Sequence, residues 1–170
     1  FTPERKLTRP AVVYYSQGHV MKQISLCERG EFKEAAGYSD RYEDLSWLAR
    51  WDDTPQEVIV HLALFAHAYR MGCRLLNGEL DVLPEYIDLL EIHPRERVPG
   101  LIVLLKAANA YRIAVDAYLP RFPIDLQHLL ETQDNMYSKQ VGRNRFARLL
   151  YQLSIYHFNH GRIEESLQAA

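Results

Sequence analysis

The sequence predicts an all-α protein, a right-handed superhelix of antiparallel helix hairpins with about eight or nine helices. Apolar residues recur at spacings of three and four along most of the chain, which is the period of an amphipathic helix. Glycine follows three of these runs, at Gly30, Gly78 and Gly161, and glycine commonly ends a helix because it adopts the left-handed conformation without strain. Stretches of alternating polarity are too short to predict a sheet.

A single glycine separates the first two predicted helices. Apolar residues from Val12 recur at helical spacing until Gly30 ends the run. A second amphipathic run goes from Glu31 toward Leu48, although Gly37 in its middle costs about 1 kcal/mol of helix stability. Two consecutive helices joined in this way predict a helical hairpin.

The next segment, 54–57, reads Thr-Pro-Gln-Glu. Threonine is expected as the N-cap, proline at the first helical position, and glutamate returns a hydrogen bond to the cap. These residues predict a long helix over about 55–76. An apolar stripe over 80–90 predicts the following helix, which the His-Pro pair at 93–94 ends.

The second half of the chain continues the helical pattern. Pro99 and Pro123 are each expected to open a helix, with Asp116 capping a short helix between them. A basic stretch over 139–148 then leads into an apolar run that ends at Gly161, after which a last helix begins.

Composition limits the classes of protein that this chain can represent. With 48% hydrophobic and 25% charged residues it has a globular composition. Its 20 Lys and Arg are balanced by 22 Asp and Glu, and the resulting charge of −2 excludes the basic field that most nucleic-acid binders use. No linker or low-complexity tract divides the chain, so residues 1–170 are expected to form one repeat domain.

Cysteine usage and hydropathy predict a cytoplasmic protein that does not bind a membrane. Cys27 and Cys73 are too few for a disulfide framework, which favours a reducing compartment. No segment approaches 18 uncharged apolar residues, and no signal peptide is visible at the start. The chain opens at Phe1 and stops inside a predicted helix at Ala170, so we expect it to be a fragment of a longer protein.

The segments after two of the helix-ending glycines repeat one another. Residues 30–36 and 161–167 share glycine, a polar residue, a large apolar residue, a charged residue, glutamate and then small or apolar residues, and 78–80 begins in the same way. The glycine permits the tight turn, the large apolar residue fills the angle between the helices, and the small residue allows close packing.

This pattern resembles the tetratricopeptide repeat. In the last hairpin Leu150, Leu153 and Ser154 stand at that family's large, large and small positions. The first hairpin departs from the family with Lys22 and Gln23, where Leu and a small residue are usual. The middle one departs with Arg70 and Met71 at those positions and with Leu83-Pro84 in place of the small pair. The glycine spacings are not multiples of 34 residues, so divergent or longer hairpins are expected.

The segments 83–91 and 99–102 are similar to the C-terminal regions of helix-turn-helix regulators of Gram-positive spore-forming bacteria, relatives of the peptide-responsive Rap, NprR and PlcR proteins. The resemblance implies a repeat domain that senses a short peptide or a protein, and it implies a homodimer. It also implies that DNA is bound only through an N-terminal domain that is missing from this sequence.

No catalytic fingerprint occurs in the sequence, so neither an enzyme nor a cofactor is expected. His157 and His160 lie three residues apart, a spacing that suits a metal site on a helix. Packing at His157 and the favourable charge at the helix end at His160 explain the pair better, so no metal is expected. An α-helical metal-dependent enzyme remains the third hypothesis.

The candidate site is the inner wall of the first and last hairpins in the repeat alignment. The residues proposed to bind a peptide are Arg148, Tyr151, Ile155, Asn159, Gln17 and Glu28, with Phe158 on the same wall. Arginine offers a bidentate fork to a carboxylate, and asparagine both donates to and accepts from a peptide backbone. The second hypothesis is an adaptor of the same fold that binds a folded protein partner.

Overall fold

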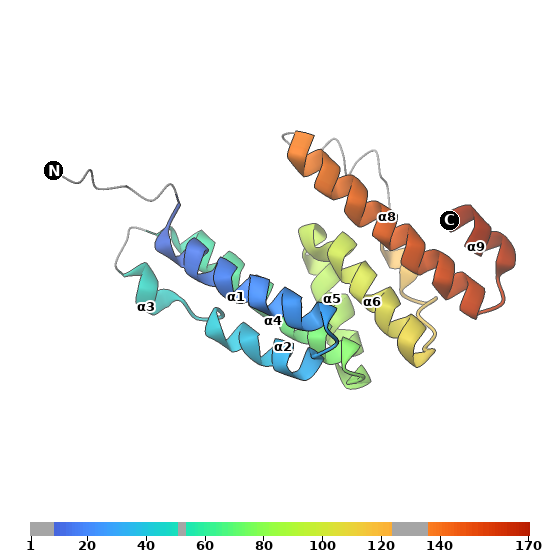
Figure 1. The fold of residues 1–170 in the computed structure, drawn as a ribbon, viewed down its shortest axis with the longest axis horizontal. Coiled ribbons are helices and arrows are strands. Elements are labelled where there is room, and N and C mark those ends of the chain that lie inside the picture. The colour runs from blue at the N-terminus through green and yellow to red at the C-terminus, as the bar shows by residue number, and fades with distance from the viewer. Residues whose placement is uncertain (1–8, 51–53, 124–135) are drawn as a thin grey trace. The chain divides into compact units, whose positions relative to one another are not determined.

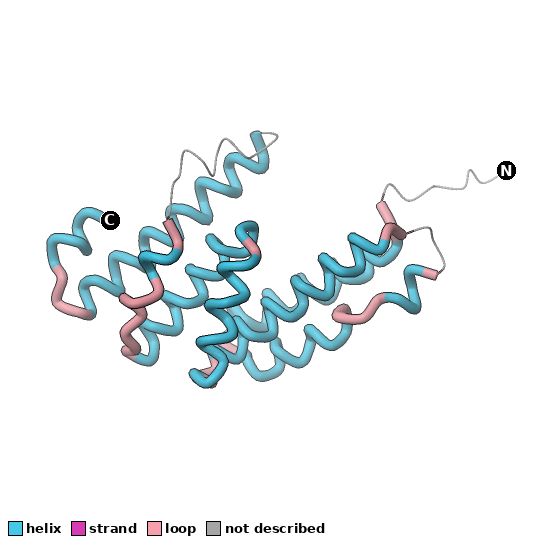
Figure 2. Tube along the Cα trace, turned by 180° about the vertical axis from the view of Figure 1, so that it is seen from behind, coloured by secondary structure: helices cyan, strands magenta, loops and turns pink. Residues whose placement is uncertain are grey.

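The computed structural model describes residues 9–50, 54–123 and 136–170, and these residues form helices, turns and loops with no strand (Figures 1 and 2). The predicted all-α class is therefore confirmed. The chain divides into two compact units, Phe1–Asn77 (unit 1) and Gly78–Ala170 (unit 2). The right-handed superhelix over a single repeat domain stays a prediction.

Unit 1 is built around a short helix that packs between two long ones. Its α-helices are α1 (Ala11–Glu28), α2 (Phe32–Tyr38), α3 (Ser46–Ala49) and α4 (Gln56–Leu76). Helix α2 contacts both α1 and α4, and α1 and α2 form the predicted antiparallel hairpin (Figure 1). One buried cluster includes Val12, Tyr42 and Ile59, and a second joins Leu26, Ala35 and Cys73.

Unit 2 is organised around the longest helix of the described chain. Its α-helices are α5 (Leu83–Ile92), α6 (Arg97–Tyr111), α8 (Met136–Asn159) and α9 (Ile163–Ala169). Helix α8 packs against α6 and α9. The 3₁₀ turns of this unit are Leu80–Val82, Pro94–Glu96 and Leu119–Arg121. Leu104, Leu105 and Leu149 are fully buried.

The glycine turns predicted from the repeat are confirmed. Gly30, Gly78 and Gly161 have φ of 79°, 89° and 72°, in the left-handed region. Gly30 N–H donates to Cys27 at 3.1 Å and Glu31 N–H donates to Leu26 at 2.9 Å, and the turn at Gly161 closes with the equivalent pair of bonds. This pair of bonds is the Schellman arrangement, which satisfies carbonyl groups at the end of a helix.

Gly30→Ala is expected to lower the free energy of unfolding by about 1–2 kcal/mol, because alanine is strained at positive φ. Gly37→Ala in α2 is the matched control and is expected to raise it by about 0.5–1 kcal/mol. An added Cβ meets no atom within 4 Å at either position, so backbone conformation alone sets the two signs. Urea denaturation measures both, and a shift of the same sign in the two variants would contradict this account.

Two expected elements differ from the structure in unit 1. The second amphipathic run does not continue as one helix, because α2 ends at Tyr38 and the chain turns before α3. After the turn, Tyr42 and Leu45 are buried in a cluster with Val12 and Ile59. Thr54 is not the N-cap of α4: Pro55 occupies that position without a side-chain cap bond, and the helix begins at Gln56.

In unit 2, the helix expected from Pro99 begins two residues earlier, at Arg97. Asp116 does not cap an α-helix, since residues 113–123 form turns and one 3₁₀ segment. Its carboxylate instead accepts hydrogen bonds from Tyr156 and Arg162. The helix expected after Pro123 lies outside the described residues.

Candidate functional site

Four of the six predicted site residues lie on α8. Arg148, Tyr151, Ile155 and Asn159 follow one another at spacings of three and four, so they share one side of the helix. Arg148 and Tyr151 are exposed, whereas Ile155 and Asn159 are half-buried. In the structure these four residues therefore lie along one side of α8, as their spacing predicts.

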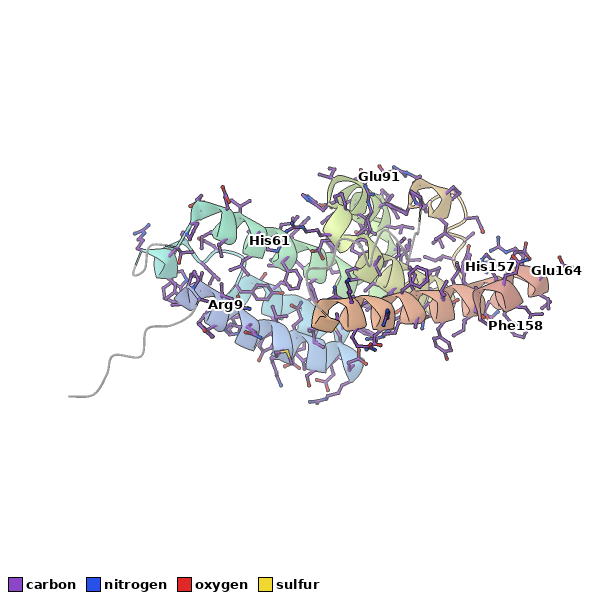
Figure 3. All side chains as sticks on the ribbon, turned by 90° about the horizontal axis from the view of Figure 1, so that it is seen from above. Arg9, His61, Glu91, His157, Phe158 and Glu164 are labelled. Atoms are coloured by element: carbon purple, nitrogen blue, oxygen red, sulfur yellow. The ribbon has the colours of Figure 1, made fainter. Side chains whose placement is uncertain are left out.

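Phe158 is a further exposed residue on this side of α8. Its side chain is 64% exposed and that of Tyr151 is 63% exposed, and a spacing of seven residues is close to two helical turns. Figure 3 shows Phe158 on a different side of α8 from His157, which is half-buried. We call Arg148, Tyr151, Ile155 and Phe158 the α8 stripe.

Asn159 is engaged in the contact between α6 and α8. Its Nδ2 donates to Oδ1 of Asn109 at 3.3 Å, and Nδ2 of Asn109 donates to the backbone and side-chain oxygens of Gln152 at 3.0 and 3.2 Å. Asn109 was not identified from the sequence, because it lies 50 positions from Asn159. Peptide binding by Asn159 stays a prediction, and its amide also holds two helices together.

Gln17 and Glu28, the remaining predicted site residues, lie on α1 of unit 1 and are both exposed. They belong to a different unit from the α8 stripe. Each set is therefore a candidate surface of its own unit. On the α8 stripe, Tyr151 and Phe158 are 63% and 64% exposed, and on α1 Tyr14 and Met21 are 43% and 59% exposed.

The two imidazoles of the predicted pair have different surroundings. His160 is exposed, with its Nδ1 2.8 Å from the backbone oxygen of Tyr156 and its ring centroid 4.3 Å from the Tyr156 ring. Burial and the nearby Arg162 lower the pKa of His157. Within the described ranges no group of three His, Cys, Asp or Glu side chains is arranged to hold a metal ion.

A polar network fastens α8 to the loop after α6. The fully buried Tyr156 hydroxyl donates to Oδ2 of Asp116 and accepts from the backbone N–H of Val115, each at 2.8 Å. Arg162 pairs with the other carboxylate oxygen of Asp116, and its guanidinium lies 5.2 Å from the centroid of the Tyr156 ring. These contacts hold the end of α8 that carries Phe158.

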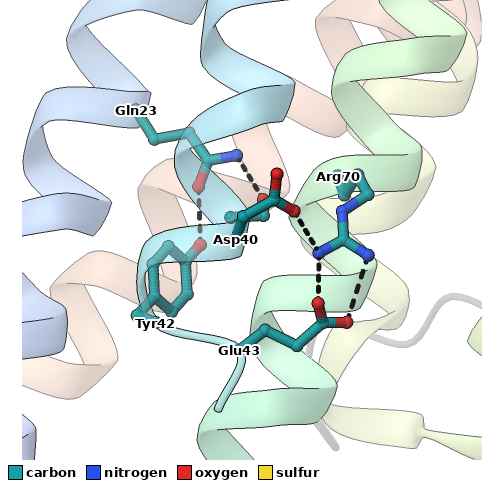
Figure 4. Close-up of polar contacts among 6 residues, drawn as sticks. Gln23, Asp40, Tyr42, Glu43 and Arg70 are labelled. Atoms are coloured by element: carbon teal, nitrogen blue, oxygen red, sulfur yellow. Dashed lines mark hydrogen bonds and ion pairs between the residues drawn. The ribbon is translucent and has the colours of Figure 1, made fainter. Parts of the chain in front are cut away.

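Unit 1 contains a second polar network, shown in Figure 4. The fully buried Gln23 donates from Nε2 to Oγ of Ser39 at 2.8 Å and accepts at Oε1 from the Tyr42 hydroxyl at 2.5 Å. Burial raises the pKa of Tyr42, which keeps its hydroxyl protonated as a donor. The network ties α1 to the segment that follows α2.

Arg70 of α4 binds the same segment from the other side (Figure 4). Its guanidinium donates to both carboxylate oxygens of Glu43, at 3.1 and 2.5 Å, and to Asp40 at 2.8 Å. The hydrogen bonds that Arg70 donates to Glu43 lower the pKa of the Glu43 carboxyl group. Gln23 and Arg70 are two of the positions at which the first two hairpins differ from the tetratricopeptide pattern.

No helix in the described part of the chain is both long and apolar enough to cross a membrane. Comparison with protein-family models, with curated proteins and with solved structures finds no match to this chain.

Proposed function

We propose that unit 2 binds an extended peptide, or an extended segment of a protein, along the α8 stripe. The observation that supports this function is the exposure of Tyr151 and Phe158 on one side of α8, with Arg148 at the end of the same stripe. Clustered apolar side chains of this size on a soluble surface commonly mark an interaction site.

The dimensions of the stripe suit a short peptide. Arg148 and Phe158 are ten residues apart, which corresponds to about 15 Å along a helix. About four or five residues of an extended peptide cover that length. Tyr151, Ile155 and Phe158 offer contacts to apolar side chains, and the Arg148 guanidinium offers a bidentate hydrogen bond to an acidic side chain or a C-terminal carboxylate.

The biological role that we propose follows the resemblance to helix-turn-helix regulators. The chain would act as the ligand-sensing and dimerising repeat domain of a bacterial transcriptional regulator, with DNA bound by a separate N-terminal domain. In a stack of helical hairpins, a ligand that binds one curvature better than another shifts the population between them. An adaptor that binds a folded protein is the alternative with the same binding surface.

Selection from a displayed library of random linear peptides tests the binding function. We expect peptides with apolar residues and a carboxylate to be enriched on the wild-type chain, and Tyr151→Ala or Phe158→Ala to weaken their binding at least about tenfold. Arg148→Ala should weaken only the peptides that carry the carboxylate. Titration of fluorescently labelled selected peptides gives the dissociation constants.

Ile163→Ala and Leu167→Ala are the matched controls. Both residues lie on α9 of the same unit, and their side chains are 51% and 73% exposed. They should bind the selected peptides as the wild type does. A library that yields no enriched peptide, or peptides whose affinity is unchanged in the Tyr151 and Phe158 variants, would contradict the proposed function.

A further inference from the structure

The two cysteines of the chain come together inside unit 1. Cys27 lies in the last turn of α1 and Cys73 near the end of α4, and their Sγ atoms are 3.1 Å apart. Helix α2 packs against both of these helices, and Leu26, Ala35 and Cys73 share one buried cluster that Cys27 borders. A disulfide has an S–S distance of about 2.05 Å, so the two sulfurs must approach by about 1 Å to form one.

The two thiols differ in their access to solvent. Cys27 is half-buried, whereas Cys73 is only 2% exposed. The hydrogen bond with Cys27 and burial both raise the pKa of the Cys73 thiol, while Nε2 of Gln23 lies 3.7 Å from its sulfur. A small oxidant from solvent therefore reaches the sulfur of Cys27 before that of Cys73. The Cys73 thiol stays protonated.

We propose that Cys27 and Cys73 are a reversible oxidation site, at which a hydroperoxide converts the two thiols into an intramolecular disulfide. This inference is independent of the proposed peptide binding, since it concerns other residues in the other unit. It rests on the distance between the two sulfurs and on their unequal exposure.

The reaction takes place in two balanced steps. The Cys27 thiolate attacks one oxygen of hydrogen peroxide, the O–O bond breaks, and a sulfenic acid and one water form once a proton reaches the leaving oxygen. The Cys73 sulfur then attacks the Cys27 sulfur, the S–O bond breaks, and the Cys73 proton leaves with the hydroxyl group as a second water. In sum, two thiols and one peroxide give one disulfide and two waters.

The bond would tie the end of α1 to the end of α4 and enclose the intervening segment, including α2. The two cysteines are 46 positions apart, so the cross-link removes much of the freedom of the unfolded chain. In a reducing compartment such a bond is transient, which is the usual behaviour of cytosolic disulfides that sense oxidants.

The test uses the full 170-residue chain, reduced and then treated with hydrogen peroxide. Maleimide labelling should find two reactive thiols after unfolding of the reduced chain and none after oxidation. Mass spectrometry should show a monomer lighter by two hydrogens and a linked peptide pair that contains Cys27 and Cys73. Dithiothreitol should restore both thiols. Disulfide-linked dimers, or sulfinic acid at Cys27 beside an intact Cys73 thiol, would overturn the proposal.

Single variants separate the roles of the two cysteines. In Cys73→Ala the sulfenic acid at Cys27 has no partner thiol, so it should persist and react with a dione probe. In Cys27→Ser the buried Cys73 should resist peroxide. Cys27→Ser changes the more exposed position and tests the assignment even where the Cys73 variant fails to fold. Equal oxidation of Cys73 with and without Cys27 would contradict the order of the two steps.

The melting temperature provides an independent readout. Oxidation of the wild-type chain should raise it by roughly 5–10 °C, because the cross-link restricts the unfolded state, and reduction should reverse the rise. Peroxide should not raise the melting temperature of either single variant. A wild-type melting temperature that is unchanged or lower with the disulfide formed would contradict the stabilising cross-link.

Discussion

Gly100→Ala is expected to lower the free energy of unfolding by about 3 kcal/mol, although alanine favours helix more than glycine does. Gly100 lies in the first turns of α6, where a Cβ would stand 2.2 Å from Cδ2 and 2.9 Å from Cδ1 of Leu90. Leu90 is fully buried on α5, so its side chain has no solvent to move into. The added methyl group must therefore separate the two helices or force Leu90 from its rotamer.

A double variant distinguishes this steric account from a backbone effect. Leu90→Ala alone should cost about 2–5 kcal/mol because it leaves a cavity. In Gly100→Ala/Leu90→Ala the new methyl group occupies part of that cavity, so the two effects should fall short of their sum by at least about 1 kcal/mol. Urea denaturation measures the cycle, and Gly18→Ala, where an added Cβ meets no atom within 4 Å, is the control. Strict additivity of the two changes would contradict the clash.

Helix positions were predictable from the sequence where a local signal sets them. Gly30, Gly78 and Gly161 end their helices because a left-handed residue is required there, and that requirement is visible in the residue itself. The break after Tyr38 has no such signal. It depends on the burial of Tyr42 and Leu45 against residues far away in the sequence, and helical periodicity does not carry that information.

In the candidate site, too, features set by neighbouring residues were predictable from the sequence, whereas contacts between residues far apart in the chain were not. The shared side of Arg148, Tyr151 and Ile155 follows from helical spacing, so the sequence predicted it. The bond from Asn159 to Asn109 spans 50 positions, and the approach of the two cysteines spans 46. Contacts of this kind depend on how helices pack, and a single sequence gives no periodic signal for them.

Gln23 is the position where a departure from the repeat pattern has the clearest physical cause. A buried amide costs free energy unless its groups are hydrogen-bonded, and both ends of Gln23 are bonded, to Ser39 and to Tyr42. The three residues lie on α1 and on the turn after α2, so the network specifies how that turn meets the helix. A small residue at the same position would satisfy the repeat pattern but would leave Ser39 and Tyr42 without these hydrogen bonds.

Gln23→Leu is therefore expected to lower the free energy of unfolding by about 2–4 kcal/mol, despite similar volume and greater hydrophobicity. The substitution removes the acceptor of the Tyr42 hydroxyl and the donor to Ser39, and both groups remain buried. The triple variant Gln23→Leu/Ser39→Ala/Tyr42→Phe removes all three polar groups together and should be more stable than Gln23→Leu alone, because no buried group has lost its partner. Urea denaturation of the single and triple variants measures the difference. A triple variant less stable than Gln23→Leu would show that packing, rather than unpaired polar groups, sets the cost at this position.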